Sequence, residues 1–295
     1  MTVALIGAGN MGGALVERLC EAQWAVTVCD IDPLRQWQAL AAGASLADTP
    51  LAAVAQLGNE GALLLVVVDA DQCREVLWGD QGASVGLRPG HTVVLCPTIA
   101  PEDTISIAER LALQGIACID APMSGGPQRA RDGRMSLMVA APAAVLERHA
   151  DLLAALSLNV MRISERVGDG ARTKLVNNLL AGINLVGAAE VLALAGRMGL
   201  DLSTTLDVIE RSSGQSWIGS DRMRRAIAND LVPRAHVTLL EKDTRLAVAA
   251  ARSSGFEGPL GASAAGVFKA ASEAGMADLD DAALLSFLRQ TAPRP

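Results

Sequence analysis

The stretch that decides the fold lies at the start of the chain and reads Val3-Ala4-Leu5-Ile6-Gly7-Ala8-Gly9-Asn10-Met11-Gly12. An apolar run is followed by the spacing GxGxxG, by a helical pattern over 12–20, and by a second apolar run over 25–29. This context distinguishes a dinucleotide site from a glycine-rich turn without a ligand. The first glycine permits the tight turn, the second lets the backbone approach a pyrophosphate, and the third allows close helix–strand packing. We therefore predict that Gly7, Gly9, Asn10, Met11 and Gly12 bind a dinucleotide, with phosphates at the helix N-terminus.

Short apolar runs alternate with helical patterns through the first half of the chain. The predicted strands cover 2–6, 25–29, 62–68, 92–95, 117–119 and 136–140, with helices over 12–20 and 101–114 between them. This rhythm is typical of βαβ units and a mainly parallel sheet. After about Ile163 the strand-like runs give way to long Ala/Leu-rich helical patterns, and 171–198 contains no proline. We predict an α/β N-terminal Rossmann-type domain over 1–164, a long interdomain helix, and an all-α C-terminal domain over 165–295.

Asp30 stands at the end of the second predicted strand, 18 residues after Gly12. At this position an acidic side chain accepts hydrogen bonds from the adenosine ribose hydroxyls, whereas a 2′-phosphate meets a like charge. Asp32 adds a second negative charge nearby. We therefore predict NAD as the cofactor in preference to NADP. Arg35 is close enough in sequence to reach a 2′-phosphate and keeps NADP open as an alternative.

The composition excludes several classes of protein. The 295 residues contain no tyrosine, which excludes the Tyr/Lys pair of short-chain dehydrogenases, and only 3 of the 25 basic residues are lysines. The net charge of −7 argues against a nucleic-acid partner or an acidic membrane surface. The five cysteines are scattered without CxxC spacing, and no His or carboxylate cluster has ligand spacing, so neither a disulfide framework nor a metal site is predicted.

The sequence favours a soluble, cytoplasmic protein without a membrane span. No signal peptide precedes the first strand, and the longest uncharged apolar run, 62–68, is far shorter than the ~20 residues that a span needs. The longer stretch over 179–196 is interrupted by Asn184 and Glu190, and we interpret it as a buried core helix.

Three later segments indicate chemistry beyond dinucleotide binding. The segment DAPMSGG over 120–126 ends a strand in a glycine-rich turn, where backbone N–H groups and the Ser124 hydroxyl could hold a carboxylate. The segment GDGARTKLVNN over 168–178 begins the long helix and places Lys174 and Asn178 on one helix face. The third segment is the pair Lys242-Asp243, which lies in another helical pattern.

Together these segments resemble the β-hydroxyacid dehydrogenase family. The resemblance runs nearly the full length of the chain, through GxGxMG at 7–12, DAPMSGG at 120–126, GxGxxxKxxNN at 168–178 and KD at 242–243. It implies a dinucleotide domain, a long interdomain helix and a helical domain, with the active site in the cleft between the domains. It also implies that Lys174 is the general acid/base and that Asn178 orients the substrate. The substrate carboxylate is expected at Ser124, Gly125 and Gly126, and an aromatic wall of the pocket at Trp217.

The same resemblance implies further cofactor contacts. Lys242 is expected near the nicotinamide, Thr98 beside the nicotinamide ribose, and Val68 and Asp69 in a loop that lines the cofactor. The chain departs from the family pattern in three places: Pro97 stands where serine is usual, Asp69 where asparagine or proline is common, and KDTRLA replaces KDLxLA.

A lysine base also fits the chemistry directly. Oxidation of an alcohol by NAD releases a proton to a base, which works best with a pKa near the operating pH. Lysine begins near ~10.4, and burial or a helix N-terminus lowers that value, whereas an arginine guanidinium stays protonated. His91, His149 and His236 are the alternative bases, and each is better explained as a surface or structural residue.

The sequence thus predicts an NAD-dependent oxidoreductase of a small hydroxy acid, similar to 3-hydroxyisobutyrate or threonate, that forms a homodimer or homotetramer. Alternatives are a semialdehyde reductase, a dehydrogenase of a phosphonate or sulfonate analogue, and a catalytically silent NAD-binding regulator. Arg129, Arg131 and Arg134 follow the carboxylate-binding turn and could answer a doubly charged acid, or be ordinary surface arginines paired with Asp132 and its neighbours.

Overall fold

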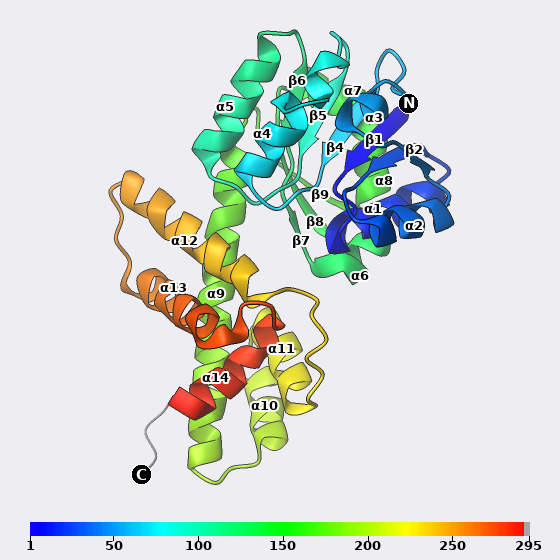
Figure 1. Cartoon of the computed structure of the whole chain (residues 1–295). Coiled ribbons are helices and arrows are strands. Elements are labelled where there is room, and N and C mark those ends of the chain that lie inside the picture. The colour runs from blue at the N-terminus through cyan, green and yellow to red at the C-terminus, as the bar shows by residue number, and fades with distance from the viewer. Residues whose placement is uncertain (292–295) are drawn as a thin grey trace. The chain divides into compact units, whose positions relative to one another are not determined.

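A computed structural model describes residues 1–291 of the chain, which divide into two compact units (Figure 1). The first unit is Met1–Lys174, and the second begins at Leu175. The boundary therefore falls inside the long helix, ten residues after the division at 164/165 that the change in sequence pattern indicates. The first unit is α/β and the second is helical, as predicted.

The first unit is built on a single sheet with the strand order β3-β2-β1-β4-β5-β6-β8-β7, and β9 pairs with β8. The strands from β3 to β6 are parallel, whereas β8 runs antiparallel to β6. The chain starts in the middle of the sheet and builds outward in both directions, which is the doubly wound arrangement of dinucleotide-binding folds. The strands are β1 Thr2–Ile6, β2 Ala25–Cys29, β3 Ser45–Leu46, β4 Ala62–Leu65, β5 Thr92–Leu95, β6 Ala117–Asp120, β7 Met123–Ser124, β8 Ser136–Ala140 and β9 Asn159–Ser164.

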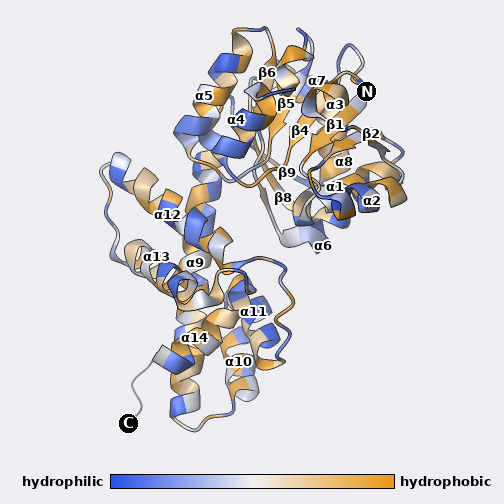
Figure 2. Cartoon of the chain, in the orientation of Figure 1, coloured by the Kyte–Doolittle hydropathy of each residue, from blue (hydrophilic) through white to orange (hydrophobic). Residues whose placement is uncertain are grey.

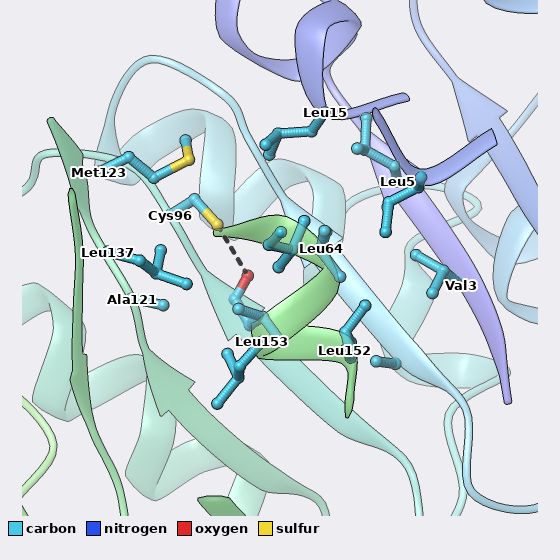
Figure 3. Packing of buried hydrophobic residues seen from close by; sticks show 14 of the residues in the cluster. Val3, Leu5, Leu15, Leu64, Cys96, Ala121, Met123, Leu137, Leu152 and Leu153 are labelled. Atoms are coloured by element: carbon cyan, nitrogen blue, oxygen red, sulfur yellow. Dashed lines mark hydrogen bonds between the residues drawn. The ribbon is translucent and has the colours of Figure 1, made fainter. Parts of the chain in front are cut away.

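Helices cover both faces of this sheet, which explains why its strands are nearly continuous apolar runs. Leu5 and Leu64 belong to the core on one face, where Figure 3 shows them with Leu15 and Leu153, while Ala4 and Leu65 belong to the core on the other. Figure 2 shows hydrophobic residues along the central strands and mixed hydropathy on the flanking helices. These helices are α1 Asn10–Glu21, α2 Pro33–Ala41, α3 Pro50–Val54, α4 Ala70–Trp78, α5 Pro101–Ala112, α6 Gly126–Arg131, α7 Ala143–Arg148 and α8 Ala150–Leu156.

The structure adds three strands to the six that the sequence predicts. β3 and β7 have two residues each, too few to show a pattern, and β9 mixes polar with apolar residues and has no buried position. β4 ends at Leu65 instead of Val68, because the chain leaves the sheet there and the backbone N–H of Val68 donates to the side chain of Gln72 at 2.9 Å.

The second unit consists of helices around one apolar core that includes Leu185, Leu192, Met223, Phe268 and Leu284, all fully buried. Its helices are the greater part of α9 Asp169–Arg197, followed by α10 Leu202–Glu210, α11 Trp217–Ile227, α12 Val237–Ser253, α13 Pro259–Ala271 and α14 Leu284–Thr291. The prediction of one long helix over 171–198 is confirmed to within two residues at each end.

The interpretation of α9 as a buried core helix is only half right. Leu185, Ala189 and Leu192 are fully buried, but Leu180 and Leu194 are 58% and 56% exposed. By length and composition α9 is the one helix in the described residues that could cross a membrane, with a mean hydropathy of 1.8 and 39% of that stretch buried. A single helix of this kind is weak support for a span, because the core helix of a soluble protein passes the same test.

Candidate functional site

The glycine-rich turn between β1 and α1 leaves no room for side chains at two positions. Gly7 has φ +94°, and a Cβ there would lie 2.7 Å from the carbonyl oxygen of Val66. A Cβ on Gly12 would lie 1.8 Å from the carbonyl oxygen of Gly7. Glycine is therefore required at both positions, in the first case by conformation and close approach and in the second by helix packing.

Gly9 has the opposite environment, because a Cβ there would meet nothing within 4 Å. Gly9 is the N-cap of α1 and makes no side-chain cap, whereas α2, α3 and α4 are capped by Asp32, Thr49 and Asp69. The first-turn N–H groups of α1 therefore have no side-chain cap, and the space beside Gly9 at the positive end of the helix dipole is open. This cradle fits the pyrophosphate of a dinucleotide.

Asp30 follows β2 directly and its carboxylate lies against the glycine-rich turn. Its Oδ2 accepts a hydrogen bond from the backbone N–H of Ala8 at 2.5 Å, and its Oδ1 accepts from Asp32 N–H at 2.8 Å. Arg35 also reaches the turn, since its guanidinium donates to Asn10 Oδ1 at 3.2 Å and to Gln38 Oε1 at 3.1 Å. Asp30, which would favour NAD, and Arg35, which could favour NADP, therefore lie beside the same turn.

The remaining cofactor candidates of the first unit lie after neighbouring parallel strands. Val68 and Asp69 follow β4, and Thr98 follows β5. The carboxyl ends of the strands form the edge at which such folds bind their ligands. The carboxylate of Asp69 accepts from Gln72 N–H at 2.9 Å and caps α4, which gives this departure from the family pattern a structural role.

The predicted carboxylate-binding turn joins β7 to α6. Gly125 and Gly126 have φ values of +129° and +77°, and Gly125 caps α6 without a side-chain hydrogen bond. Two of the three arginines that follow form ion pairs: Arg131 with Glu17 of α1, and Arg134 with Asp132 at 2.7 Å. These two therefore match the interpretation as ordinary paired arginines.

Lys174 stands in the second turn of α9, and the start of that helix is held by Asp120 from the end of β6. Asp120 is 1% exposed, and its Oδ2 accepts from the backbone N–H groups of Gly168 at 2.8 Å and Ala171 at 3.0 Å. Lys174 is 7% exposed, in contrast to Lys269, which is exposed and pairs with Glu273. Lys174 is the most deeply buried of the three lysines.

Burial raises the pKa of Asp120 to about 6, against the opposing effect of N–H groups from Ala171, Gly168 and Gly170. The native chain thus binds this proton more tightly than the unfolded chain, whose aspartates titrate near ~3.9. The free energy of unfolding is therefore expected to fall as pH rises from 4 through 6, by about 3 kcal/mol from this group. Denaturant titrations of the wild type and Asp120→Asn at pH 4 and pH 8 measure it. From pH 4 to pH 8, the free energy of unfolding of Asp120→Asn should rise relative to that of the wild type by about 3 kcal/mol. An equal pH dependence in the two proteins would contradict the assignment of this proton to Asp120.

Three site candidates of the helical unit are linked by polar contacts around two buried side chains, Asn178 and Asp243. Asn178 on α9 donates through Nδ2 to Asp243 Oδ2 at 2.6 Å and accepts from Asn177 Nδ2 at 3.0 Å. Lys242 Nζ lies 3.3 Å from the second carboxylate oxygen of Asp243. Asn178 and Asp243 are 8% and 7% exposed. Trp217 is not part of this group of polar contacts; it lies at the start of α11 with 47% of its surface exposed.

The histidines have structural partners. His91 accepts from Arg88 N–H through Nδ1 at 3.2 Å, and its Nε2 lies 2.9 Å from Gly58 O. His149 is fully buried with Nε2 2.7 Å from Thr92 Oγ1, and desolvation lowers its pKa. His236 precedes α12 with Nδ1 2.8 Å from Asp278 O. Within residues 1–291 no group of His, Cys, Asp and Glu side chains could hold a metal ion.

Two functional candidates have no assigned role in the sequence analysis. Asp120 and Asp243 are each quoted there within a motif, but their partners lie 48 and 65 residues away along the chain. The sequence signal that could have identified them is their place in the motifs: Asp120 begins DAPMSGG, and Asp243 follows Lys242 directly.

The fold and the glycine-rich turn define the class of the protein as dinucleotide-binding. Residues 2–164 match the model of the NAD-binding domain of 6-phosphogluconate dehydrogenase, and residues 168–288 match the NAD-binding model of NADP-dependent 3-hydroxyisobutyrate dehydrogenase. The chain belongs to the β-hydroxyacid dehydrogenase family, whose members act on the CH–OH group of hydroxy acids.

Individual relatives resemble the chain over almost its full length. L-threonate dehydrogenase of Cupriavidus necator is 36% identical over 284 residues, which cover 96% of this chain and 94% of the relative. The 3-hydroxyisobutyrate dehydrogenase of Pseudomonas aeruginosa is 34% identical over 274 residues, which cover 90% of this chain and 90% of the relative. A crystal structure of 3-hydroxyisobutyrate dehydrogenase from Salmonella typhimurium has a TM-score of 0.90 at 33% identity, with 97% and 99% of the two chains covered.

Proposed function

We propose that the chain oxidises a small hydroxy acid similar to threonate or 3-hydroxyisobutyrate, with Lys174 as the general acid/base. The observation that carries this assignment is the position of Lys174: it is buried and lies one helical turn after a start that Asp120 holds in place. Relatives in the family support the substrate class, because they include proteins named L-threonate dehydrogenase and 3-hydroxyisobutyrate dehydrogenase.

The proposed roles of the chain's residues follow from what their atoms can do. Ser124 and the N–H groups of the turn over 124–126 hold the substrate carboxylate, which fixes the direction of the hydroxyl group. Lys174 accepts the hydroxyl proton during oxidation and returns it during reduction. Asn178, one turn further along α9, orients the substrate. A bound nicotinamide supplies the hydride acceptor. An assay of NADH formation with threonate, 3-hydroxyisobutyrate and other small hydroxy acids tests the proposal. If none of these acids is oxidised, the proposal is overturned.

We infer that the cofactor is NAD in preference to NADP. The carboxylate of Asp30 is held against the turn by Ala8 and Asp32, so a 2′-phosphate at the adenosine ribose would face a fixed negative charge. Arg35, the residue that could counter this charge, is engaged with Asn10, with Gln38 and, at 4.0 Å, with Asp32.

The substitution Asp30→Asn keeps the side-chain shape and removes the charge. It is expected to lower the ratio of kcat/KM with NAD to kcat/KM with NADP by about tenfold or more, because a charged hydrogen bond is worth ~1.5–3 kcal/mol. Steady-state assays with both cofactors measure the ratio, with Asp151→Asn, an exposed position on α8, as the surface control. A wild type that prefers NADP, or an unchanged ratio in Asp30→Asn, would contradict the inference.

We further propose that the chain forms a homodimer or homotetramer through α9. Side chains on one stripe of this helix are apolar and exposed: Leu180, Val191 and Leu194. Sedimentation at micromolar concentration should give at least a dimer, and Leu194→Glu should reduce the mass because a charge on an apolar interface is costly. A wild-type monomer under these conditions would refute the proposal.

A further inference from the structure

The start of α9 is shaped around one buried carboxylate. Asp120, at the last residue of β6, directs Oδ2 at the N–H groups of Gly168 and Ala171. These N–H groups belong to the end of the helix where the backbone lacks internal hydrogen-bond acceptors. The contact spans 48 and 51 residues of sequence, so it fixes the helix start to the central sheet.

Both glycines of the segment GDG over 168–170 serve this contact. A Cβ on Gly170 would lie 2.9 Å from Asp120 Cγ and Oδ2, and 2.9 Å from the carbonyl oxygen of Met138. Gly168 has φ +100°, a conformation that side chains disfavour, and this geometry aims its N–H at the carboxylate. The helix therefore approaches the sheet as closely as its backbone allows.

The docked face of the helix is the face that carries the proposed base. Lys174 follows Gly170 by four residues, so the two positions lie above one another on α9. A rise of ~1.5 Å per residue puts them only ~6 Å apart along the axis. A shift of the helix start relative to the sheet would therefore move Lys174 relative to the turns at the carboxyl ends of the strands.

We propose that Asp120 is a positioning residue for catalysis, which docks the start of α9 against the sheet and thereby fixes the place of Lys174. The inference rests on the proposed role of Lys174 and adds the cause of its placement. Asp120 is expected to influence the chemical step through the helix, without contact with the substrate or the cofactor.

Two substitutions break the contact in different ways. Asp120→Ala removes the acceptor, and Gly170→Ala keeps the carboxylate but forces the helix away from it. Each is expected to lower kcat about a hundredfold, because a displacement of ~1 Å can cost that much, while the dissociation constant of NAD changes by less than about twofold. Asp120→Asn places an amide oxygen at the position of Oδ2, keeps both hydrogen bonds, and should restore kcat to within about threefold of the wild type.

Matched variants separate positioning from general loss of stability. Asp201 caps α10 through a hydrogen bond from Thr204 N–H at 2.8 Å, so Asp201→Ala loses a comparable cap in the helical unit. Gly196 lies in α9 with only an ordinary contact, 3.6 Å from Leu202 Cδ2, so Gly196→Ala adds the same methyl group without a clash. Both controls should keep the wild-type kcat.

The same experiment distinguishes this inference from the assignment of Lys174. If Lys174→Ala abolishes turnover and Asp120→Ala and Gly170→Ala both keep wild-type kcat, Asp120 has no positioning role and the lysine assignment stands. If Lys174→Ala keeps its turnover, the lysine assignment fails and the inference fails with it. Should Asp120→Ala not fold, Gly170→Ala with Asp120→Asn decides: equal loss in both would overturn the proposal, and loss in Gly170→Ala alone would support it.

Discussion

Replacement of Lys174 by alanine is expected to lower kcat about a thousandfold, because a positioned proton acceptor contributes ~10²–10⁴ to the rate. The dissociation constant of NAD should stay within about twofold of the wild-type value, since the candidate cofactor residues of the first unit lie at the glycine-rich turn and at the loops after β2, β4 and β5. Stopped-flow turnover at saturating substrate gives kcat, and fluorescence titration gives the cofactor affinity.

Lys174→Arg is the sharper companion variant. It keeps the positive charge and the length of the side chain, but its guanidinium stays protonated and does not accept a proton at any working pH. Its kcat should therefore fall as far as that of Lys174→Ala. Lys269→Ala is the control, because Lys269 is exposed on α13 and pairs with Glu273 at 3.6 Å. An active Lys174→Arg enzyme would exclude a base at this position and leave Lys174 at most a charge-bearing role.

Two glycines of one turn are expected to respond in opposite ways to the same methyl group. Gly9→Ala should leave the free energy of unfolding unchanged or slightly higher, because its Cβ meets no atom within 4 Å, yet it should weaken NAD binding at least tenfold. Gly12→Ala should lower the free energy of unfolding by about 1–3 kcal/mol, because its Cβ would lie 1.8 Å from Gly7 O. Denaturant unfolding and cofactor titration of both variants measure the two effects.

Comparison of the two variants separates an effect on cofactor binding from an effect on the stability of the fold. A loss of affinity in Gly9→Ala without any loss of stability assigns the open space beside Gly9 to the bound pyrophosphate. Gly13→Ala is a useful third variant, because Gly13 also lies in α1 but its Cβ would meet only Ala8 O at 3.2 Å. If Gly9→Ala binds NAD as tightly as the wild type, the turn is not the phosphate site.

Much of the fold is predictable because local pattern and long-range packing agree. The apolar runs over 2–6, 25–29, 92–95 and 136–140 coincide with strands, since a sheet covered on both faces needs apolar residues on both sides of its strands. The glycine-rich turn is predictable for a similar reason, because its constraints act between residues close in sequence. β9 was missed because its residues are partly exposed and pair with a strand already formed.

The site is less predictable, because its geometry depends on contacts between distant segments. The sequence pattern indicates Lys174 and Asn178 as site residues. No local signal shows that Asp120 holds the start of α9, or that Asp243 accepts a hydrogen bond from Asn178. The Ala/Leu-rich composition of the helical domain favours a dimer surface but does not place it, because composition does not separate a core helix from one that leaves a face uncovered, as α9 does.

The most direct test of the account is NADH formation by the wild type and by Lys174→Ala with a panel of small hydroxy acids that includes L-threonate and 3-hydroxyisobutyrate. The account predicts that the wild type reduces NAD with at least one of these two acids, faster than it reduces NADP, and that Lys174→Ala retains about a thousandth of that rate or less. Equal rates in the two proteins, or no reduction of NAD with any acid in the panel, would contradict it.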